Sequence, residues 1–108
     1  MPARGDLKPL SAGAAWIGGE IVPIAEAKIG VTDWGFTHSD CVYDVVPFVS
    51  GAFFRLPEYV ARLQASIATG QFHIAQQPSA IRDIMHQLVA ATGLSDAYCA
   101  MVVAREQP

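Results

Sequence analysis

Short apolar runs in the first half of the chain predict two β-hairpins. The runs at 14–17 and 20–24 flank two successive glycines, which favour a tight turn because both can adopt positive φ. A further hairpin is predicted from the runs at 42–49 and 52–56, which flank a Ser-Gly pair. The stretch 1–13 is rich in proline, glycine and small residues and is expected to be a flexible arm.

Helical spacing of the apolar residues in the second half predicts two helices. The first opens at Pro57, where the missing N–H is not needed, and stops at Gly70. Its apolar residues share one face: Val60, Leu63 and Ile67. The second helix follows a cap at Ser79, ends at Gly93 and has the clearest amphipathic pattern in the chain.

A last apolar run, 97–104, is hydrophobic at both sets of alternating positions, which is typical of a strand covered on both faces. The order of strands, two helices and a final strand indicates an α+β fold, in which an antiparallel-rich sheet carries two helices on one face. The length of 108 residues suits a single small domain, here 14–108 after the arm.

Composition adds one expectation about the surface. Hydrophobic residues make up 52% of the chain and charged residues only 16%, against about a quarter in typical domains. A domain of this size has a high ratio of surface to volume and needs more polar covering than this. We therefore expect another domain or a second subunit to cover part of its apolar surface. The alternative is an ordinary domain with an apolar surface.

Charge and cysteine content argue against several classes of function. The net charge of -3, without a basic stripe, argues against a nucleic-acid partner. The longest apolar run is too short to span a bilayer and the N-terminus lacks a signal-peptide pattern, so we expect a cytoplasmic protein. Cys41 and Cys99 lie far apart without metal-ligand spacing. A disulfide between them is possible, but two buried thiols are favoured.

Arg62 is the leading candidate for an anion ligand. A guanidinium offers a planar fork of donors with a permanent charge, which suits a dianionic phosphate, and a helix would hold it in place. The alternative is a surface ion pair with Glu58, one helical turn earlier. Helix geometry alone favours that ion pair.

The polar segment 37–40 follows an expected turn at 33–35. Its histidine, His38, could transfer protons near neutral pH, whereas the serine and aspartate are better suited to bonding the loop backbone. A metal site built on this segment has little support, because the spacing matches no zinc or facial-triad pattern. A Cys–His nucleophile pair lacks an orienting third group.

Two pairs of residues are candidates for the wall of a binding pocket. Tyr43 and Val45 share one face of their strand, as do Tyr98 and Ala100, because alternate side chains of a strand point to the same side. A tyrosine supplies an apolar wall with a polar tip. The alternative for all four residues is packing of the core against the helices.

The order of these motifs resembles the N-terminal domain of the pyridoxal-phosphate (PLP) enzymes of fold type IV. That family includes branched-chain and D-amino-acid aminotransferases and (R)-selective amine transaminases. The resemblance spans about 16–104 and depends on four phrases: 32–40, Tyr43-Asp44-Val45, Phe54-Arg55-Leu56 and Arg62-Leu63. The elbow and the strand after it look most like the (R)-selective amine transaminases. Val42 departs from these enzymes, which often have threonine there.

The resemblance implies roles for particular residues. Arg62 would bind the cofactor phosphate, and the substrate pocket would be lined by His38, Tyr43, Val45, Tyr98 and Ala100. Such enzymes need a lysine that holds PLP covalently, but neither Lys8 nor Lys28 lies where the family keeps it. The chain would then be the N-terminal part of a longer enzyme, without the larger cofactor-binding domain, without a catalytic residue and inactive by itself.

The activity implied for the complete enzyme is PLP-dependent transfer of an amino group from an amine to an α-keto acid such as pyruvate. The amine is expected to be (R)-configured, the enzyme to be a homodimer, and no metal to take part. Alternatives within the family are branched-chain or D-amino-acid aminotransferases and aminodeoxychorismate lyase. An alternative of another class is a non-catalytic dimerisation or interaction domain.

Overall fold

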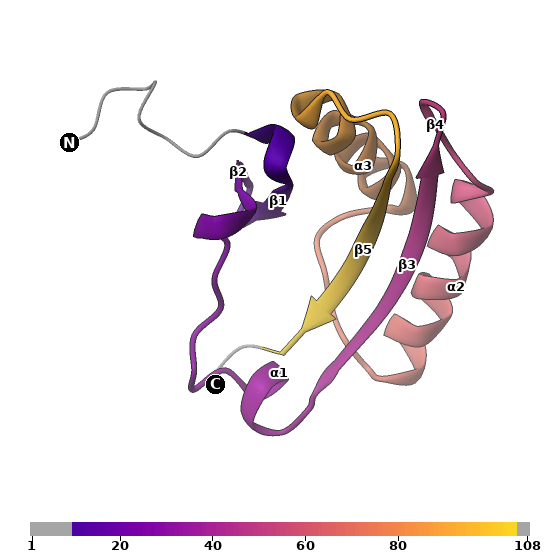
Figure 1. Ribbon diagram of the computed structural model, residues 1–108. Coiled ribbons are helices and arrows are strands. Elements are labelled where there is room, and N and C mark those ends of the chain that lie inside the picture. The colour runs from indigo at the N-terminus through magenta and orange to yellow at the C-terminus, as the bar shows by residue number, and fades with distance from the viewer. Residues whose placement is uncertain (1–9, 106–108) are drawn as a thin grey trace.

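The structure is a computed structural model that describes residues 10–105 of the 108-residue chain (Figure 1). Most of the expected arm, residues 1–9, lies outside the described part, and the remainder of it includes a short 3-10 turn. The elements in chain order are η2 (Leu10–Ala12), β1 (Ala14–Ile17), β2 (Glu20–Pro23), η3 (Ile24–Glu26), α1 (Trp34–Thr37), β3 (Cys41–Val49), β4 (Ala52–Phe53), α2 (Leu56–Thr69), α3 (Pro78–Thr92) and β5 (Ala97–Ala104).

An antiparallel sheet with the strand order β4-β3-β5 forms the centre of the described structure. Helices α2 and α3 lie on the same side of this sheet (Figure 1). The hairpin of β1 and β2 forms a separate two-stranded sheet that contacts α3. The α+β fold with an antiparallel sheet and two helices on one face is therefore confirmed.

Both predicted hairpins form at the residues whose backbone permits them. Between β3 and β4, Ser50 and Gly51 have φ angles of 52° and 80°, as a two-residue hairpin loop requires. The Ser50 N–H donates to the Asp96 carboxylate at 2.9 Å, which ties this loop to the residue before β5. Strand β4 ends at Phe53, short of the predicted 52–56, because Arg55 adopts a left-handed conformation (φ 53°) and α2 starts directly after it.

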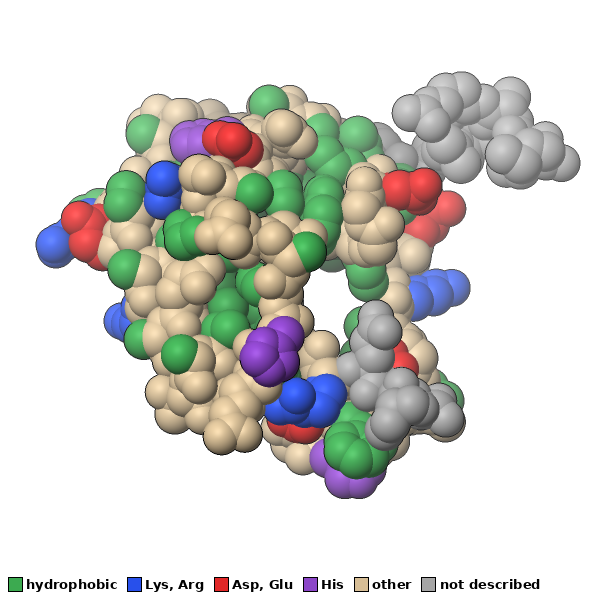
Figure 2. Space-filling model, turned by 180° about the vertical axis from the view of Figure 1, so that it is seen from behind, with side chains coloured by type: hydrophobic (Ala, Val, Ile, Leu, Met, Phe, Trp, Pro, Cys, Tyr) green, Lys and Arg blue, Asp and Glu red, His purple; other side chains and the backbone are tan. Residues whose placement is uncertain are grey.

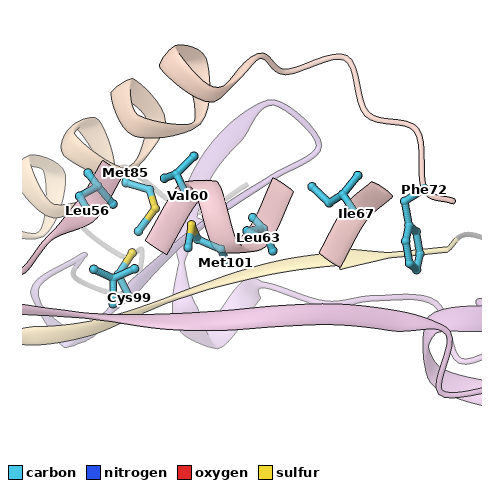
Figure 3. Close-up of a cluster of buried hydrophobic side chains, with 9 residues drawn as sticks. Leu56, Val60, Leu63, Ile67, Phe72, Met85, Cys99 and Met101 are labelled. Atoms are coloured by element: carbon cyan, nitrogen blue, oxygen red, sulfur yellow. The ribbon is translucent and has the colours of Figure 1, made fainter. Parts of the chain in front are cut away.

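The hydrophobic core lies between the sheet and the two helices (Figure 3). The predicted apolar face of α2 is buried there, as are alternate residues of β3 and β5. The members of this core are Val46, Leu56, Val60, Leu63, Ile67, Phe72, Met85, Cys99 and Met101. The strands therefore contribute only one set of alternating residues to this core, and the other set faces away from the helices.

Three local predictions are wrong. Strand β5 is not covered on both faces: Cys99 is buried, whereas Tyr98 is 82% exposed, because both helices pack on one side of the sheet. Helix α3 already begins at Pro78, which has no N–H to leave unpaired, so Ser79 lies inside the helix and is not its cap. Cys41 is exposed, and both cysteines are free thiols.

None of the described helices has the length and apolar character needed to cross a membrane.

Candidate active-site surface

One face of the sheet carries four of the five predicted substrate-pocket residues. We call this surface, which faces away from the helices, the open face. It consists of Cys41, Tyr43, Val45, Pro47 and Val49 from β3 and of Tyr98, Ala100, Val102 and Ala104 from β5. The register of the two strands aligns Tyr43 with Val102, Val45 with Ala100 and Pro47 with Tyr98. The predicted residues of the two strands are thus neighbours on one surface, although two helices separate them in sequence.

The open face is apolar and exposed. Tyr43 is 69% exposed and Tyr98 82%, so neither packs in the core, which was the alternative considered for them. No side chain of the open face is charged. An apolar surface with two tyrosine hydroxyl groups can hold an apolar substrate group, but its side chains offer no cation to a carboxylate.

His38 is placed at the end of the open face where β3 begins and β5 ends. It caps α1, a single helical turn where a turn was expected, and the Gly35 N–H of that turn donates to the Arg105 carbonyl at 2.8 Å. The His38 ring lies 4.8 Å from the Trp34 ring, and its Nδ1 lies 2.7 Å from Thr37 Oγ1. The side chain is exposed, so it remains accessible to a ligand.

An ion pair that sequence reasoning missed holds this end of the sheet together. Arg105 donates from Nε to Asp40 at 2.5 Å and from Nη2 to the Gly70 carbonyl at 3.1 Å, and its guanidinium lies 4.3 Å from the centre of the Phe72 ring. The partners are 65 residues apart, so no local spacing could have revealed the pair. The prediction that the Asp40 side chain bonds the loop backbone is wrong, because its carboxylate accepts from the Arg105 guanidinium and only its main chain bonds the backbone of Trp34 and Arg105.

Arg62 makes a two-pronged ion pair with Asp44 of β3. Nε lies 2.6 Å from Oδ2, and Nη2 lies 2.7 Å from Oδ1. The interpretation of Arg62 as a partner of Glu58 is wrong, because Glu58 lies near Arg55, at 3.9 Å, and Asp44 offers both carboxylate oxygens to the guanidinium. The guanidinium also lies 5.1 Å above the centre of the Tyr59 ring.

The Asp44–Arg62 contact shifts the titration of both groups. The hydrogen bonds from Arg62 lower the pKa of Asp44, and the same contact raises the pKa of Arg62. Because the pKa of Asp44 is lowered in the folded state, the stabilisation by this pair is present at neutral pH. It is lost as the pH falls through the lowered pKa. Both groups are therefore charged under ordinary conditions.

The ion pair lies at a free edge of the sheet, next to the open face. Strand β4 pairs only with Phe48 and Val49, so the beginning of β3 has a neighbour strand on one side only. Asp44 faces α2, whereas its neighbours Tyr43 and Val45 belong to the open face. Arg62 and the open face therefore lie on opposite sides of β3, which has no neighbouring strand at this edge.

The linings of two hollows on the described surface include predicted site residues. One, of about 240 Å³, is lined by Arg62 with Phe54, Arg55, Glu58 and Tyr59. The other, of about 280 Å³, lies between α3, β1 and β5 and is lined mainly by apolar residues; of the predicted site residues it includes only Ala100. Figure 2, seen from behind, shows hydrophobic side chains over the middle of that view and Lys and Arg side chains well apart from one another. Among the described residues, no cluster of His, Cys, Asp or Glu could hold a metal.

Comparison with known proteins identifies aminotransferases. The D-alanine aminotransferase of Listeria monocytogenes serotype 1/2a (strain 10403S) is 29% identical over 79 residues, which are 73% of this chain and 27% of that protein. A putative branched-chain-amino-acid aminotransferase of Methanocaldococcus jannaschii is 28% identical over 90 residues, 83% of this chain and 31% of that protein. No model of a protein family matches the chain.

The fold agrees with these relatives. The branched-chain amino acid aminotransferase from Escherichia coli superimposes with a TM-score of 0.82 at 20% identity, over 86% of this chain and 33% of that one. The chain is thus a homologue of aminotransferases of fold type IV and has the fold of their N-terminal domain, as the sequence predicted. It spans about a quarter to a third of the length of the curated relatives described above. The (R)-selective subgroup stays a prediction.

Proposed function

We propose that this chain is the N-terminal domain of a longer PLP-dependent transaminase. In this proposal the enzyme transfers an amino group from an (R)-configured amine to an α-keto acid such as pyruvate, as a cytoplasmic homodimer. The observation that carries the proposal is the register of β3 with β5, which makes one surface of Tyr43, Val45, Tyr98 and Ala100. The length of the relatives supports a second domain, and the apolar open face supports a covering partner.

Arg62 has the chemistry needed to hold the cofactor phosphate. The guanidinium side chain is 67% exposed, and Asp44 occupies only Nε and one proton of Nη2. Its remaining donors make no hydrogen bond to any residue in 10–105. A phosphate could therefore bind at the outer end of the guanidinium without breaking the existing pair. We assign phosphate binding to Arg62, and the aromatic and aliphatic wall of the substrate pocket to the open face.

Bound PLP would supply an electron-withdrawing ring that eases removal of a proton from the substrate carbon. The part of the chain described here would bind and orient. Arg62 fixes the anionic end of the cofactor, while Tyr43 and Tyr98 exclude water from the apolar side of the substrate. His38, at the end of the open face, would lie at the pocket entrance. The proton-transferring lysine would come from outside this chain.

The composition of the open face supports an amine donor without a carboxylate, since none of its side chains is a cation. D-alanine, which is also (R)-configured at its amine carbon, is the second candidate donor, because a D-alanine aminotransferase is among the relatives. Both candidates predict the same chirality at the reacting carbon. An L-selective branched-chain aminotransferase predicts the opposite chirality.

We expect the longer protein, supplied with PLP, to accept (R)-1-phenylethylamine and to reject its (S)-enantiomer. The ketone formed from the amine, with pyruvate as acceptor, can be followed by absorbance, and D-alanine against L-alanine can be tested with 2-oxobutyrate. The 108-residue chain by itself serves as the control and should show no turnover. A preference for (S)-amines or L-amino acids would exclude the proposed donor class, and turnover by the isolated chain would exclude the proposed division into two domains.

We expect Arg62→Ala to raise the dissociation constant for PLP by about tenfold or more, the effect of losing a charge-assisted phosphate contact. The measurement is an absorbance titration of the apoprotein of the longer enzyme. Arg55→Ala is the matched control, because Arg55 lines the same hollow and is equally exposed but is assigned no ligand. Equal effects of the two substitutions would contradict a specific role of Arg62 in binding the phosphate.

A further inference from the structure

We infer that Asp44 is a positioning residue, which holds the Arg62 guanidinium so that its outer edge can bind the cofactor phosphate. The inference rests on the proposed function, because it requires Arg62 to be a phosphate ligand. Asp44 lies on β3 and Arg62 on α2, 18 residues further along the chain. Neither the motif that suggested Arg62 nor the spacing along α2 indicates a role for Asp44.

The carboxylate of Asp44 is held in place from three directions. Oδ1 accepts a hydrogen bond from the Val45 N–H at 3.0 Å and another from Arg62 Nη2 at 2.7 Å. Oδ2 accepts from Arg62 Nε at 2.6 Å. The side chain is 12% exposed, so it has little freedom to move out into water. A planar carboxylate fixed in this way also fixes the plane of the guanidinium that it binds.

The bonds to Asp44 determine which edge of Arg62 faces outward. They use Nε and one proton of Nη2, which belong to the same edge of the guanidinium. The Nη1 protons and the second Nη2 proton form the opposite end, and this end makes no hydrogen bond within residues 10–105. An arginine without Asp44 would have to lose rotamer freedom when the anion binds, whereas a pre-oriented one has already lost it.

Direct competition between Asp44 and the phosphate for Arg62 is the alternative, and the hydrogen bonds that competition would break argue against it. The Asp44 side chain is 12% exposed with Arg62 in place, and displacement of Arg62 would remove two charge-assisted hydrogen bonds and leave only the Val45 N–H as its donor in the described structure. The two hypotheses predict opposite changes in phosphate affinity when the charge of Asp44 is removed. Removal of a negative charge near the site would strengthen anion binding if Asp44 only competes with or repels the phosphate, and would weaken it if Asp44 positions Arg62.

The test is a double-mutant cycle on PLP binding by the apoprotein of the longer enzyme, with Asp44→Asn, Arg62→Ala and the double variant. Asn is nearly isosteric with Asp, and the thermal denaturation midpoint of each apoprotein shows whether it is folded. We expect Asp44→Asn to raise the dissociation constant by about tenfold, as outer partners of ligands do at metal sites. We expect the same change to have no effect when Arg62 is already alanine.

Each other outcome has a distinct meaning. Unchanged or tighter binding by Asp44→Asn, with a clear loss in Arg62→Ala, would overturn the positioning role and leave the proposed function intact. An equal loss from Asp44→Asn in both backgrounds would show a general structural effect and would also overturn it. No loss in Arg62→Ala would remove the assigned phosphate ligand, and the positioning role with it.

Discussion

Replacement of Leu63 by alanine is expected to lower the free energy of unfolding by about 2–5 kcal/mol, the range for truncating a large aliphatic side chain in a core. Leu63 is 2% exposed and lies on α2 among the residues that pack on the sheet (Figure 3). It also borders the apolar hollow of about 280 Å³ between α3, β1 and β5. Removal of its side chain would enlarge that hollow, so the loss of contacts adds to the loss of burial.

Leu94→Ala is the matched control, since it is the same chemical change at a residue that is 37% exposed. We expect it to change stability by less than about 1 kcal/mol. Equilibrium urea denaturation of the 108-residue chain measures the stability of both variants. An unchanged slope of the unfolding free energy against urea concentration would show that they unfold from the same state. Similar losses in the two variants would contradict the core described here.

The helices were predictable because their signals are local. The spacing of Val60, Leu63 and Ile67 is enough to define the buried face of α2, and the proline and glycine at its ends limit its length. The hairpin loop at Ser50-Gly51 was predictable for the same reason, since its residues tolerate positive φ. Where the local signal was ambiguous, as at Ser79 beside Pro78, the cap was misplaced by two residues, since the helix is capped at Gln77.

The sequence predicted which site residues share a face of one strand, but not which strands are neighbours. That Tyr43 and Val45 share a face follows from the period of a strand, but the adjacency of β3 and β5 depends on pairing across two helices, which no local pattern specifies. The coverage of β5 was misjudged because a continuous apolar run resembles a strand packed on both faces. The low content of charged residues was the better signal, since it predicted apolar surface beyond what the core can bury.

The partner of Arg62 could have been found from a signal that was overlooked. On β3 the residues that face the helices are Val42, Asp44, Val46 and Phe48, so one carboxylate stands in an otherwise apolar row. A charge on a largely buried face needs a partner, and Arg62 on the facing helix is the cation that the fold supplies. The spacing within the helix favoured Glu58, because such spacing relates only residues of the same helix and leaves out Asp44 on β3.

Gly35→Ala is expected to destabilise the fold by about 1–3 kcal/mol, the usual effect of forcing extra volume into a packed site. A Cβ at this position would lie 2.7 Å from the Ala104 Cβ, which is closer than two such atoms can approach. Alanine would otherwise be the better residue in a helical turn, by about 0.5–1 kcal/mol, so a net loss would show that the close approach dominates. The contact matters for the candidate site because Gly35 joins α1, and with it His38, to the end of β5.

The double variant Gly35→Ala/Ala104→Gly isolates this contact. Without the Ala104 side chain, the nearest remaining atoms to the new Cβ are the Ala104 Cα and the Arg105 carbonyl oxygen, both at 3.5 Å, which is ordinary van der Waals contact. We therefore expect the double variant to lose less stability than the sum of the two single variants, by at least about 1 kcal/mol in urea denaturation. Strict additivity would mean that α1 moves away from β5 without resistance. In that case Gly35 would be a permissive residue of the turn, and the position of His38 would not depend on its contact with β5.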